Sequence, residues 1–387
     1  MKRRIGVVTV ARSDYGIYLP ILRKIQQDPE LELVLIAGGM HLSPEFGLTV
    51  NTLEADGFYP AAKVEMLLSS DSPEGVAKSL GVGVIGFSQA FAQLKPDLLL
   101  LLGDRFEMMA AAVAALPFKI PMAHIHGGES TEGLIDEAIR HSITKMSHIH
   151  FASTEGHAAR IRQMGEEPWR ITVSGAPGLD NLQKMALLSA DTLQRQHGFD
   201  LSQPPLLMTY HPVTLDYENT EYQVTELLAA LKACALPLIF TFPNADTSGR
   251  KIIEMIQSFI KGNSLARVAV NLGTEVYFSL MAHAAAMVGN SSSGIVEAAS
   301  FKLPVVNIGD RQRGRFHARN VIDCGYPRAQ ILTAIRTAVS KEFRETLRDL
   351  VNPYGDGRAA ERIVAGLKSI SLDNLLLFKR FHQISEA

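Results

Sequence analysis

Short apolar runs alternate with longer amphipathic segments along the chain. In the first half, these runs are bounded by turn-forming or polar residues and predict buried strands at Ile5–Val10, Leu33–Ala37, Leu98–Leu102, Met122–Ile125 and Ile149–Ala152. Segments of helical length accompany them at Ile17–Gln27, Pro73–Leu94, Arg105–Leu116 and Leu134–Lys145. This alternation predicts an α/β fold, in which helices cover both faces of a parallel sheet.

The same pattern resumes in the second half. Further strands are predicted at Leu206–Thr209, Leu238–Phe242, Ala266–Val270, Ala286–Val288 and Val305–Ile308, followed by a helical stretch over Asp356–Leu377. The glycines and proline of Ser174–Gly178 interrupt the pattern between the two halves. We therefore expect two Rossmann-like domains, residues 1–178 and 179–365, with a cleft between them and a C-terminal helix over 366–387.

Composition narrows the class of protein. The chain has 387 residues, 47% hydrophobic and 20% charged, and its net charge of −2 lacks the basic character of nucleic-acid-binding domains. Two cysteines, Cys234 and Cys324, make neither a disulfide framework nor a four-cysteine zinc site, which favours a reducing cytoplasm. The apolar runs are too short for a signal peptide or for a bilayer span of about 20 residues, so we expect no membrane partner.

Polar residues follow several predicted strands of the first domain. Gly103-Asp104-Arg105 follows one strand, and His124-Ile125-His126-Gly127-Gly128-Glu129 covers the end of the next. Two acidic and two basic residues within 136–141 then share one face of a helix. Ligands of such sheets bind beyond the carboxyl ends of the strands, so these groups predict a general acid/base cluster. The alternative is a network of helix caps and salt bridges.

Two further regions predict anion binding. Arg12 follows the first strand, at the head of the helix predicted over Ile17–Gln27, where it is placed to hold a phosphate. The alternative is an N-cap by Ser13 or Asp14 with Arg12 in solvent. Later, the small residues of Gly289–Gly294 precede a helix containing Glu297, and Gly309–Arg315 contains three arginines. Backbone N–H groups, serine hydroxyls and arginines together predict a diphosphate site, with the glutamate on a ribose. Ordinary serine N-caps are the alternative.

Two other motifs suggest different chemistries. Gly81-Val82-Gly83-Val84-Ile85-Gly86 has the spacing of a dinucleotide fingerprint, but it lies within a predicted helix instead of after a strand. Close helix packing is the favoured interpretation. His124 and His126, with Asp104 and Glu129, have the donor types of a zinc or manganese hydrolase, although any strand places alternate residues on one face.

Together these stretches resemble the hydrolysing UDP-N-acetylglucosamine 2-epimerases of bacterial sialic-acid and legionaminic-acid biosynthesis. The resemblance runs in order through Arg12–Gly16, Gly38–His41, Leu102–Arg105, His124–Glu129, Asp136–Lys145, His211–Thr214, Pro243–Gly249, Val288–Glu297 and Asn307–Arg315. It implies a GT-B-like architecture whose C-terminal helix returns to the first domain. It also implies a nucleotide-sugar substrate, no metal or other cofactor, and assembly as a homodimer or homotetramer.

The resemblance implies roles for individual residues by their motif positions. The acid/base carboxylates would be Asp104, Glu129 and Asp136, and the catalytic set would also include His126 and His211. UDP would be held by Arg12, Gly289, Ser291, Ser292, Glu297 and Arg311, and the sugar by His41 and Arg105. Many relatives carry glutamate where this chain has His126, whereas a subset that resembles the bacterial sialic-acid enzymes shares the histidine. Some relatives carry arginine in place of Val296.

The implied reaction eliminates UDP from UDP-N-acetylglucosamine to give 2-acetamidoglucal, whose hydration releases N-acetylmannosamine. The nearest alternative is the same reaction on UDP-2,4-diacetamido-2,4,6-trideoxyglucose. A non-hydrolysing 2-epimerase, a metal-dependent hydrolase and a non-catalytic sugar-nucleotide sensor are further alternatives.

Overall fold

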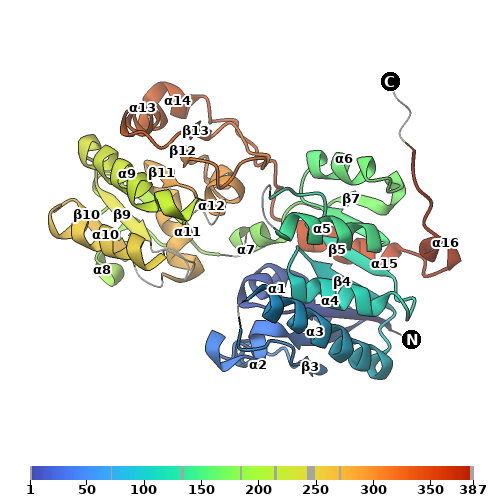
Figure 1. Ribbon diagram of the computed structural model, residues 1–387. Coiled ribbons are helices and arrows are strands. Elements are labelled where there is room, and N and C mark those ends of the chain that lie inside the picture. Colours follow the sequence, from blue (N-terminus) through green and yellow to red (C-terminus); the bar gives the residue numbers. More distant parts are fainter. Residues whose placement is uncertain are drawn as a thin grey trace. The chain divides into compact units, whose positions relative to one another are not determined.

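The computed structural model describes residues 2–70, 72–131, 135–183, 185–212, 216–241, 249–269 and 272–383. The chain forms two compact units (Figure 1). The first consists of Met1–Gln183 and Tyr354–Ala387, and the second is Lys184–Pro353. Each unit has a parallel sheet with helices, so the predicted α/β class is confirmed.

The first unit contains a seven-stranded sheet in the order β3-β2-β1-β4-β5-β6-β7, with all neighbours parallel. The strands are β1 (Arg3–Thr9), β2 (Leu31–Gly38), β3 (Ala62–Val64), β4 (Leu98–Leu102), β5 (Met122–Ile125), β6 (Ile149–Ala152) and β7 (Ile171–Val173). The central strand β4 consists of five leucines, all of them buried. Such a strand is stable only where both faces of the sheet are covered.

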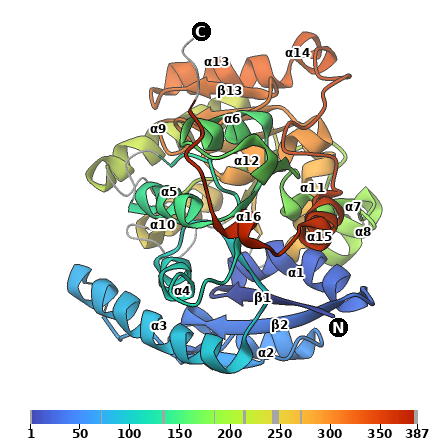
Figure 2. The ribbon, with the colours of Figure 1, turned by 90° about the vertical axis from the view of Figure 1, so that its right-hand side faces the viewer.

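Helices from both ends of the chain cover this sheet. They are α1 (Arg12–Gln27), α2 (Val50–Ala55), α3 (Pro73–Leu94), α4 (Phe106–Ala115), α5 (Ile135–Met146), α6 (Glu155–Gln163), α7 (Asp180–Gln183), α15 (Ala359–Ser369) and α16 (Asn374–Leu377). Helix α4 packs against both α3 and α5, and α1 packs against α15. Figure 2 shows α15, from the end of the chain, beside α1 from its beginning.

The C-terminal segment belongs to the core of the first unit. Ile363 and Leu367 of α15 are buried in the same hydrophobic cluster as α1 and the central strands. The single helical stretch expected over Asp356–Leu377 is wrong, because it is two helices. Asp373 caps the second, accepting a hydrogen bond from Leu376 N, and so starts a new helix after the break. The expected domain boundaries lay at 178 and 365, whereas the units divide after Gln183 and before Tyr354.

The second unit contains a six-stranded parallel sheet in the order β10-β9-β8-β11-β12-β13. Its strands are β8 (Leu206–Thr209), β9 (Leu238–Thr241), β10 (Ala266–Ala269), β11 (Ala286–Gly289), β12 (Val305–Ile308) and β13 (Val321–Cys324). Its helices are α8 (Ala190–His197), α9 (Thr220–Cys234), α10 (Gly249–Lys261), α11 (Gly273–His283), α12 (Ser292–Val296), α13 (Arg328–Val339) and α14 (Lys341–Glu345). A separate hydrophobic core lies within this unit.

The glycines that match a dinucleotide fingerprint lie inside α3, as the helix prediction required. A Cβ on Gly83 would lie 2.5 Å from Met66 Cε and 2.9 Å from Ala110 Cβ, and one on Gly86 would lie 2.6 Å from Val64 Cγ1. These two glycines therefore let the helix approach α4 and β3 closely. Gly81 meets nothing within 4 Å and has no such packing role.

Candidate active site

Three candidate carboxylates lie after strands of the first sheet. Asp104 follows β4, Glu129 follows β5, and Asp136 is in the first turn of α5. Asp104 comes directly after β4 and forms an ion pair with Arg140 of α5. Only 3% of the Arg140 side chain is exposed, so its charge requires anionic partners inside the protein. Arg140 also contacts Glu137 at 3.2 Å and Thr131 Oγ1 at 3.0 Å. The network holds Asp104 at a fixed position at the sheet edge.

Glu137 anchors this network. Its Oε1 accepts a hydrogen bond from Ser130 Oγ at 3.0 Å and lies 3.0 Å from His141 Nε2, and its Oε2 accepts one from Thr131 N at 2.5 Å. Burial acts to raise the pKa of Glu137, but these hydrogen bonds to the anionic form outweigh it and hold the pKa below its ordinary value. Glu137 is thus suited to remain an anion.

Glu129 belongs to a second set of contacts, beyond β5. Its Oε1 lies 2.5 Å from His126 Nδ1 and accepts a hydrogen bond from Ser153 Oγ at 2.7 Å. His126 has a φ of 64°, in the left-handed region that only a few per cent of non-glycine residues occupy. This backbone conformation brings the His126 ring back over Glu129.

Asp136 lies in the first turn of α5 and is half-buried. Burial raises its pKa, while the charge of Arg105 acts in the opposite direction. Arg105 itself is held by Glu107, with Nε 3.1 Å from Oε2 and Nη2 2.7 Å from Oε1. A carboxyl group with a raised pKa is suited to hold a proton and release it during a reaction.

His41 is fully buried in the first unit. Its Nε2 lies 2.9 Å from Thr9 Oγ1 and its Nδ1 lies 2.7 Å from Thr49 Oγ1. Thr9 also bonds to Asp14, a buried carboxylate that accepts hydrogen bonds from Val10 N and Ala11 N, both at 3.0 Å. The predicted sugar-pocket residue His41 therefore has both ring nitrogens engaged within the protein.

Arg12 is the first residue of α1 and is exposed. Asp14, three residues after the N-cap residue Ala11, bonds to that residue's backbone N–H and supports the start of the helix. The N-cap residue is thus Ala11 and not Ser13 or Asp14, although Asp14 supports the turn and the Arg12 side chain is exposed. A phosphate contact by Arg12 stays a prediction.

The metal-site interpretation finds little support in the geometry around His124. Its Nε2 lies 2.7 Å from Gly103 O and its Nδ1 3.1 Å from Thr144 Oγ1, and burial lowers its pKa to about 3. Within the described ranges, no three His, Cys, Asp or Glu side chains are grouped as metal ligands would be. His124 is therefore positioned as a structural link between β4, β5 and α5.

In the second unit, the end of β11 is joined to neighbouring loops by Asn290. Asn290 Oδ1 accepts a hydrogen bond from His211 N at 2.7 Å, and its Nδ2 donates one to His211 O at 2.8 Å. Its carbonyl oxygen accepts hydrogen bonds from Arg311 Nη1 at 3.1 Å and Gln312 Nε2 at 2.8 Å. One buried side chain and its backbone thus join the two predicted diphosphate-binding segments, Gly289–Gly294 and Gly309–Arg315, to His211.

Glycine is required before this asparagine. Gly289 has a φ of 138°, and a Cβ there would lie 1.9 Å from Thr209 O of the neighbouring strand. Ser291 then caps α12, with its Oγ accepting a hydrogen bond from Ser293 N at 3.3 Å, and Ser292 is exposed. The helix has only five residues, so Glu297 follows it as its C-cap residue instead of lying inside it as expected.

His211 and Tyr277 add polar groups to this region. The His211 ring is buried, its Nδ1 has no hydrogen-bond partner among the described residues, and burial together with the Arg311 charge lowers its pKa to about 4. The Tyr277 hydroxyl lies near Ser291, Ser293 and Thr209, which act to lower its pKa, while burial raises that pKa to about 12. The ring of His211 is therefore neutral near pH 7.

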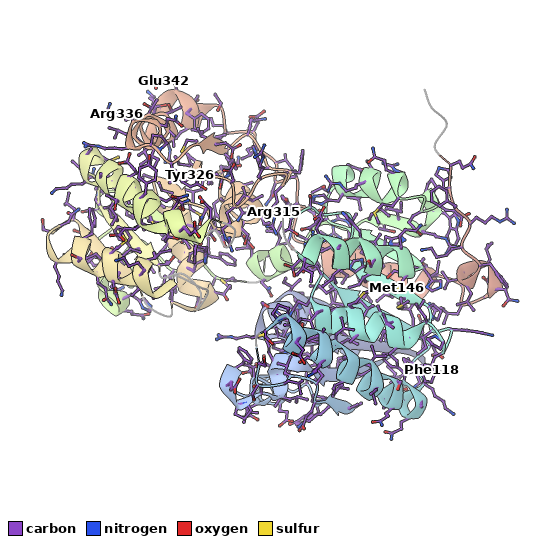
Figure 3. The ribbon with its side chains drawn as sticks, in the orientation of Figure 1. Phe118, Met146, Arg315, Tyr326, Arg336 and Glu342 are labelled. Carbon is purple, nitrogen blue, oxygen red and sulfur yellow. The ribbon has the colours of Figure 1, made fainter. Side chains whose placement is uncertain are left out.

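A cavity of about 550 Å³ opens beside the arginine-rich loop that follows β12. Arg313 and Arg315 line it together with Tyr326. Figure 3 shows Arg315 and Tyr326 in this second unit. The loop thus offers two arginines near a hollow in addition to Arg311.

Comparison with known proteins identifies the family. A model of the UDP-N-acetylglucosamine 2-epimerase family matches residues 23–368. The chain belongs to the UDP-N-acetylglucosamine 2-epimerase family. It is 39% identical to the UDP-N,N'-diacetylbacillosamine 2-epimerase (hydrolyzing) of Legionella pneumophila, over 98% of this chain and 99% of that protein. It is 41% identical to the GDP/UDP-N,N'-diacetylbacillosamine 2-epimerase (hydrolyzing) of Campylobacter jejuni, over 97% of this chain and 98% of that protein.

The fold of this epimerase-family enzyme matches that of solved family members. Its similarity to the crystal structure of UDP-GlcNAc 2-epimerase from Neisseria meningitidis bound to UDP-GlcNAc has a TM-score of 0.79 at 18% identity. The match covers 95% of this chain and 100% of that chain. The GT-B-like fold is thereby confirmed. In the part of the chain that the structure describes, helices that combine the length and the apolarity needed to cross a membrane are absent.

Several polar residues near the candidate site are absent from the set that the sequence predicts. Asn290 belongs to the predicted anion-binding segment Gly289–Gly294, in which the sequence pattern indicates a role for the serines and not for the asparagine. Glu107 lies inside the helix predicted over Arg105–Leu116, and Asp14 is predicted only as a possible helix cap, so neither is assigned to the site from the sequence. Tyr277 carried no sequence signal, because it belongs to a helix that contacts the serine turn only in the folded unit.

Proposed function

We propose that this enzyme is a hydrolysing 2-epimerase that releases UDP and a free sugar inverted at carbon 2. The observation that carries the proposal is the set of three carboxylates, Asp104, Glu129 and Asp136, each in a different environment at one edge of the first sheet. The named substrates of the relatives at 39% and 41% identity favour UDP-N,N'-diacetylbacillosamine, a 2,4-diacetamido-2,4,6-trideoxy sugar nucleotide, as the substrate.

The three environments suit successive proton transfers. Carbon 2 of a sugar is not acidic, so its proton is removed only as the bond from carbon 1 to UDP breaks. Asp104 and Glu129 are the lead candidates for the carboxylate that takes this proton, because each is fixed by an ion pair or hydrogen bonds. Asp136, whose pKa burial raises, is the partner that can hold a proton for return to carbon 2.

The second unit supplies groups for the leaving diphosphate. Arg311 is held against Asn290 O, and Ser291 and Ser292 occupy the turn after β11. Positive charge and N–H donors at these positions would stabilise the negative charge that develops on UDP. Glu297 would bind the ribose hydroxyls. Elimination of UDP and of the carbon-2 proton gives a 2-acetamidoglycal with a double bond between carbons 1 and 2. Water then adds its hydroxyl to carbon 1 and a proton to carbon 2.

UDP-N-acetylglucosamine is a second candidate substrate. It is favoured by the family model, whose description names this sugar nucleotide, and by the sequence motifs that resemble those of enzymes releasing N-acetylmannosamine. The chemistry at carbons 1 and 2 is the same for both substrates, because both carry a 2-acetamido group. The two candidates differ only at carbons 4 and 6.

Proton NMR in deuterated water tests the proposal directly. Purified enzyme with UDP-N,N'-diacetylbacillosamine is expected to release UDP and a manno-configured free sugar with deuterium at carbon 2. A parallel reaction contains UDP-N-acetylglucosamine, and EDTA is present in both. Release of UDP without deuterium at carbon 2 would indicate simple hydrolysis, whereas an epimerised sugar still linked to UDP would indicate a non-hydrolysing enzyme. Either result contradicts the proposal.

A further inference from the structure

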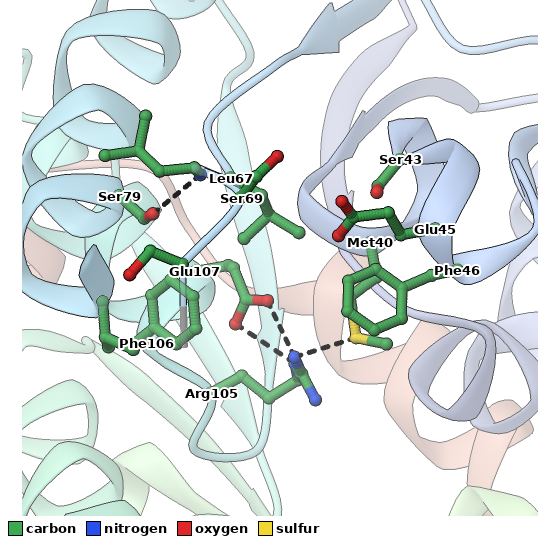
Figure 4. Close-up of a pocket in the computed structure, with 13 residues that line it drawn as sticks. Met40, Ser43, Glu45, Phe46, Leu67, Ser69, Ser79, Arg105, Phe106 and Glu107 are labelled. Carbon is green, nitrogen blue, oxygen red and sulfur yellow. Dashed lines mark hydrogen bonds and ion pairs between the residues drawn. The ribbon is translucent and has the colours of Figure 1, made fainter. Parts of the chain in front are cut away.

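A cavity in the first unit begins at Arg105, next to the predicted catalytic carboxylate Asp104. Its volume is about 440 Å³. Its walls come from the turns after β2, from the segment after β3, and from the start of α3 and α4 (Figure 4). Because water occupies about 30 Å³ per molecule, the cavity has room for substituents of a sugar ring. The cavity therefore lies beside the position where the sugar is expected to bind.

The guanidinium of Arg105 is fixed at this cavity. Glu107, which is fully buried, binds it through two oxygens, and Nη2 also lies 3.1 Å from Met40 Sδ. Figure 4 shows these three contacts converging on Arg105. Nη1 of Arg105 has no hydrogen-bond partner among the described residues, which leaves a donor for a ligand. An arginine that a buried carboxylate holds in place, and that keeps one N–H group unpaired, is suited to binding a carbonyl or hydroxyl oxygen.

The walls combine apolar surface with a few polar groups. Phe46, Leu67 and Phe106 provide apolar surface, and Ser43, Ser69 and Glu45 provide hydroxyl and carboxylate groups. An acetamido group matches this combination, because its methyl is apolar, its N–H needs an acceptor and its carbonyl needs a donor. A 6-deoxy methyl adds apolar surface. A sugar with hydroxyls at carbons 4 and 6 would leave hydroxyl groups against apolar walls without hydrogen-bond partners, which lowers its binding affinity.

We propose that this cavity receives the 4-acetamido and 6-methyl substituents of the sugar and so selects 2,4-diacetamido-2,4,6-trideoxy sugar nucleotides over UDP-N-acetylglucosamine. The inference rests on the proposed function for the identity of the site. It adds a specificity pocket, formed by the segments of residues 40–46, 67–70, 76–79 and 105–107, that acts on carbons 4 and 6 and takes no part in the reaction at carbons 1 and 2.

The test measures binding, so that it does not depend on turnover. Isothermal titration in an Asp104→Asn background gives the Kd of each sugar nucleotide without consumption of substrate. We expect the Kd of UDP-N,N'-diacetylbacillosamine to be at least tenfold lower than that of UDP-N-acetylglucosamine, in line with roughly 10- to 200-fold for one added methylene in an apolar pocket. Adding Ser69→Trp should fill the cavity and reduce this preference to less than about threefold.

Thr52→Trp is the matched control. Thr52 is exposed on α2 and does not line the cavity, so this variant adds the same side chain and should keep the preference. Titration with UDP alone and thermal unfolding check that each variant is folded. Equal Kd values for the two sugar nucleotides, or an equal effect of Ser69→Trp on both, would overturn the pocket. If the preference responds to Ser69→Trp but the NMR experiment detects no epimerised product, the pocket stands and the proposed function fails.

Discussion

Among single residues, Asp104 and Arg140 depend most strongly on each other. Arg140 is almost wholly buried, and Asp104 and Glu137 both neutralise its charge. The two carboxylates are exposed to a similar extent, 25% for Asp104 and 28% for Glu137. They differ in their other partners, because Glu137 also bonds to Ser130, Thr131 and His141. Within the described residues, Asp104 therefore has a free oxygen for a ligand, while Glu137 keeps Arg140 neutralised. We therefore expect Asp104 to take part in the reaction and Glu137 to have a structural role.

Asp104→Asn should consequently remove activity without unfolding the site. The amide still accepts a hydrogen bond from Arg140 but cannot take a proton from carbon 2. We expect kcat to fall by about 10²- to 10⁴-fold, the usual contribution of a general acid or base, with the Kd of UDP changed less than about threefold. Rates by NMR and titration with UDP measure the two quantities.

Asp97→Asn serves as control for this change. Asp97 lies just before β4, at the opposite edge of the same sheet, and its carboxylate accepts a hydrogen bond from Arg4 N. This variant should retain kcat. A fall in UDP affinity on Asp104→Asn, with kcat preserved, would assign Asp104 to binding.

The candidate site could be predicted from the sequence only where position along a strand was sufficient. Asp104 and Glu129 directly follow predicted strands, and a parallel sheet places such residues along one edge. Asn290 could not be predicted as the link between loops, because its partners are 79 residues away at His211 and 21 residues away at Arg311. Contacts of this kind follow from tertiary packing and leave no local pattern.

Among the helices, α3 contains a glycine pattern that matches a cofactor fingerprint but allows close packing instead. Its three spaced glycines match a cofactor fingerprint, yet two of them face α4 and β3 at distances that exclude any side chain. Gly81, the first of the three, is exposed. The helix is therefore expected to tolerate change at one glycine and not at the next.

Gly81→Ala and Gly83→Ala form a matched pair on this helix. Gly81→Ala should stabilise the enzyme by up to about 1 kcal/mol, since alanine favours helix and nothing lies nearby. Gly83→Ala should destabilise it by about 1–3 kcal/mol, because the new methyl collides with Ala110 and Met66. Urea unfolding followed by circular dichroism compares them. Similar effects from both substitutions would contradict the packing role of Gly83.

The strands whose bounds the sequence predicted are buried along their whole length. β4, β5, β6, β8 and β12 have the predicted bounds, because their short runs are mostly apolar and end at turn-forming or polar residues. β3 and β7, which have three residues each, and β13 were not predicted. These lie at the sheet edges and are partly exposed, so their sequences lack the continuous apolar pattern.

Across the whole molecule, burial keeps several histidines neutral. Burial lowers the pKa of His41, His148, His157 and His211 to about 4, and that of His124 to about 3. In the unfolded chain these side chains take up protons near pH 6.5. Asp14 acts oppositely, because burial raises its pKa to about 7 and the folded state holds its proton. The histidines outnumber this one carboxyl group.

The free energy of unfolding should therefore fall as pH decreases from 6.5 to 4.5. Over this range the unfolded chain binds more protons than the folded chain, so stability rises with pH, by about 1.4 kcal/mol per pH unit for each net proton. Urea unfolding across the range gives the slope, and His124→Asn should lower that slope by about one proton. A stability that is constant, or greater at pH 4.5, would refute this account.

The first unit is assembled from two stretches of chain that are separated by the entire second unit. During synthesis, the second unit leaves the ribosome whole, whereas the first emerges without α15, whose Ile363 and Leu367 complete its core. The face of α1 that α15 covers stays exposed until Ala359–Ser369 have been made. The nascent enzyme thus passes through a stage with one finished unit and one open hydrophobic core, the kind of intermediate that chaperones bind.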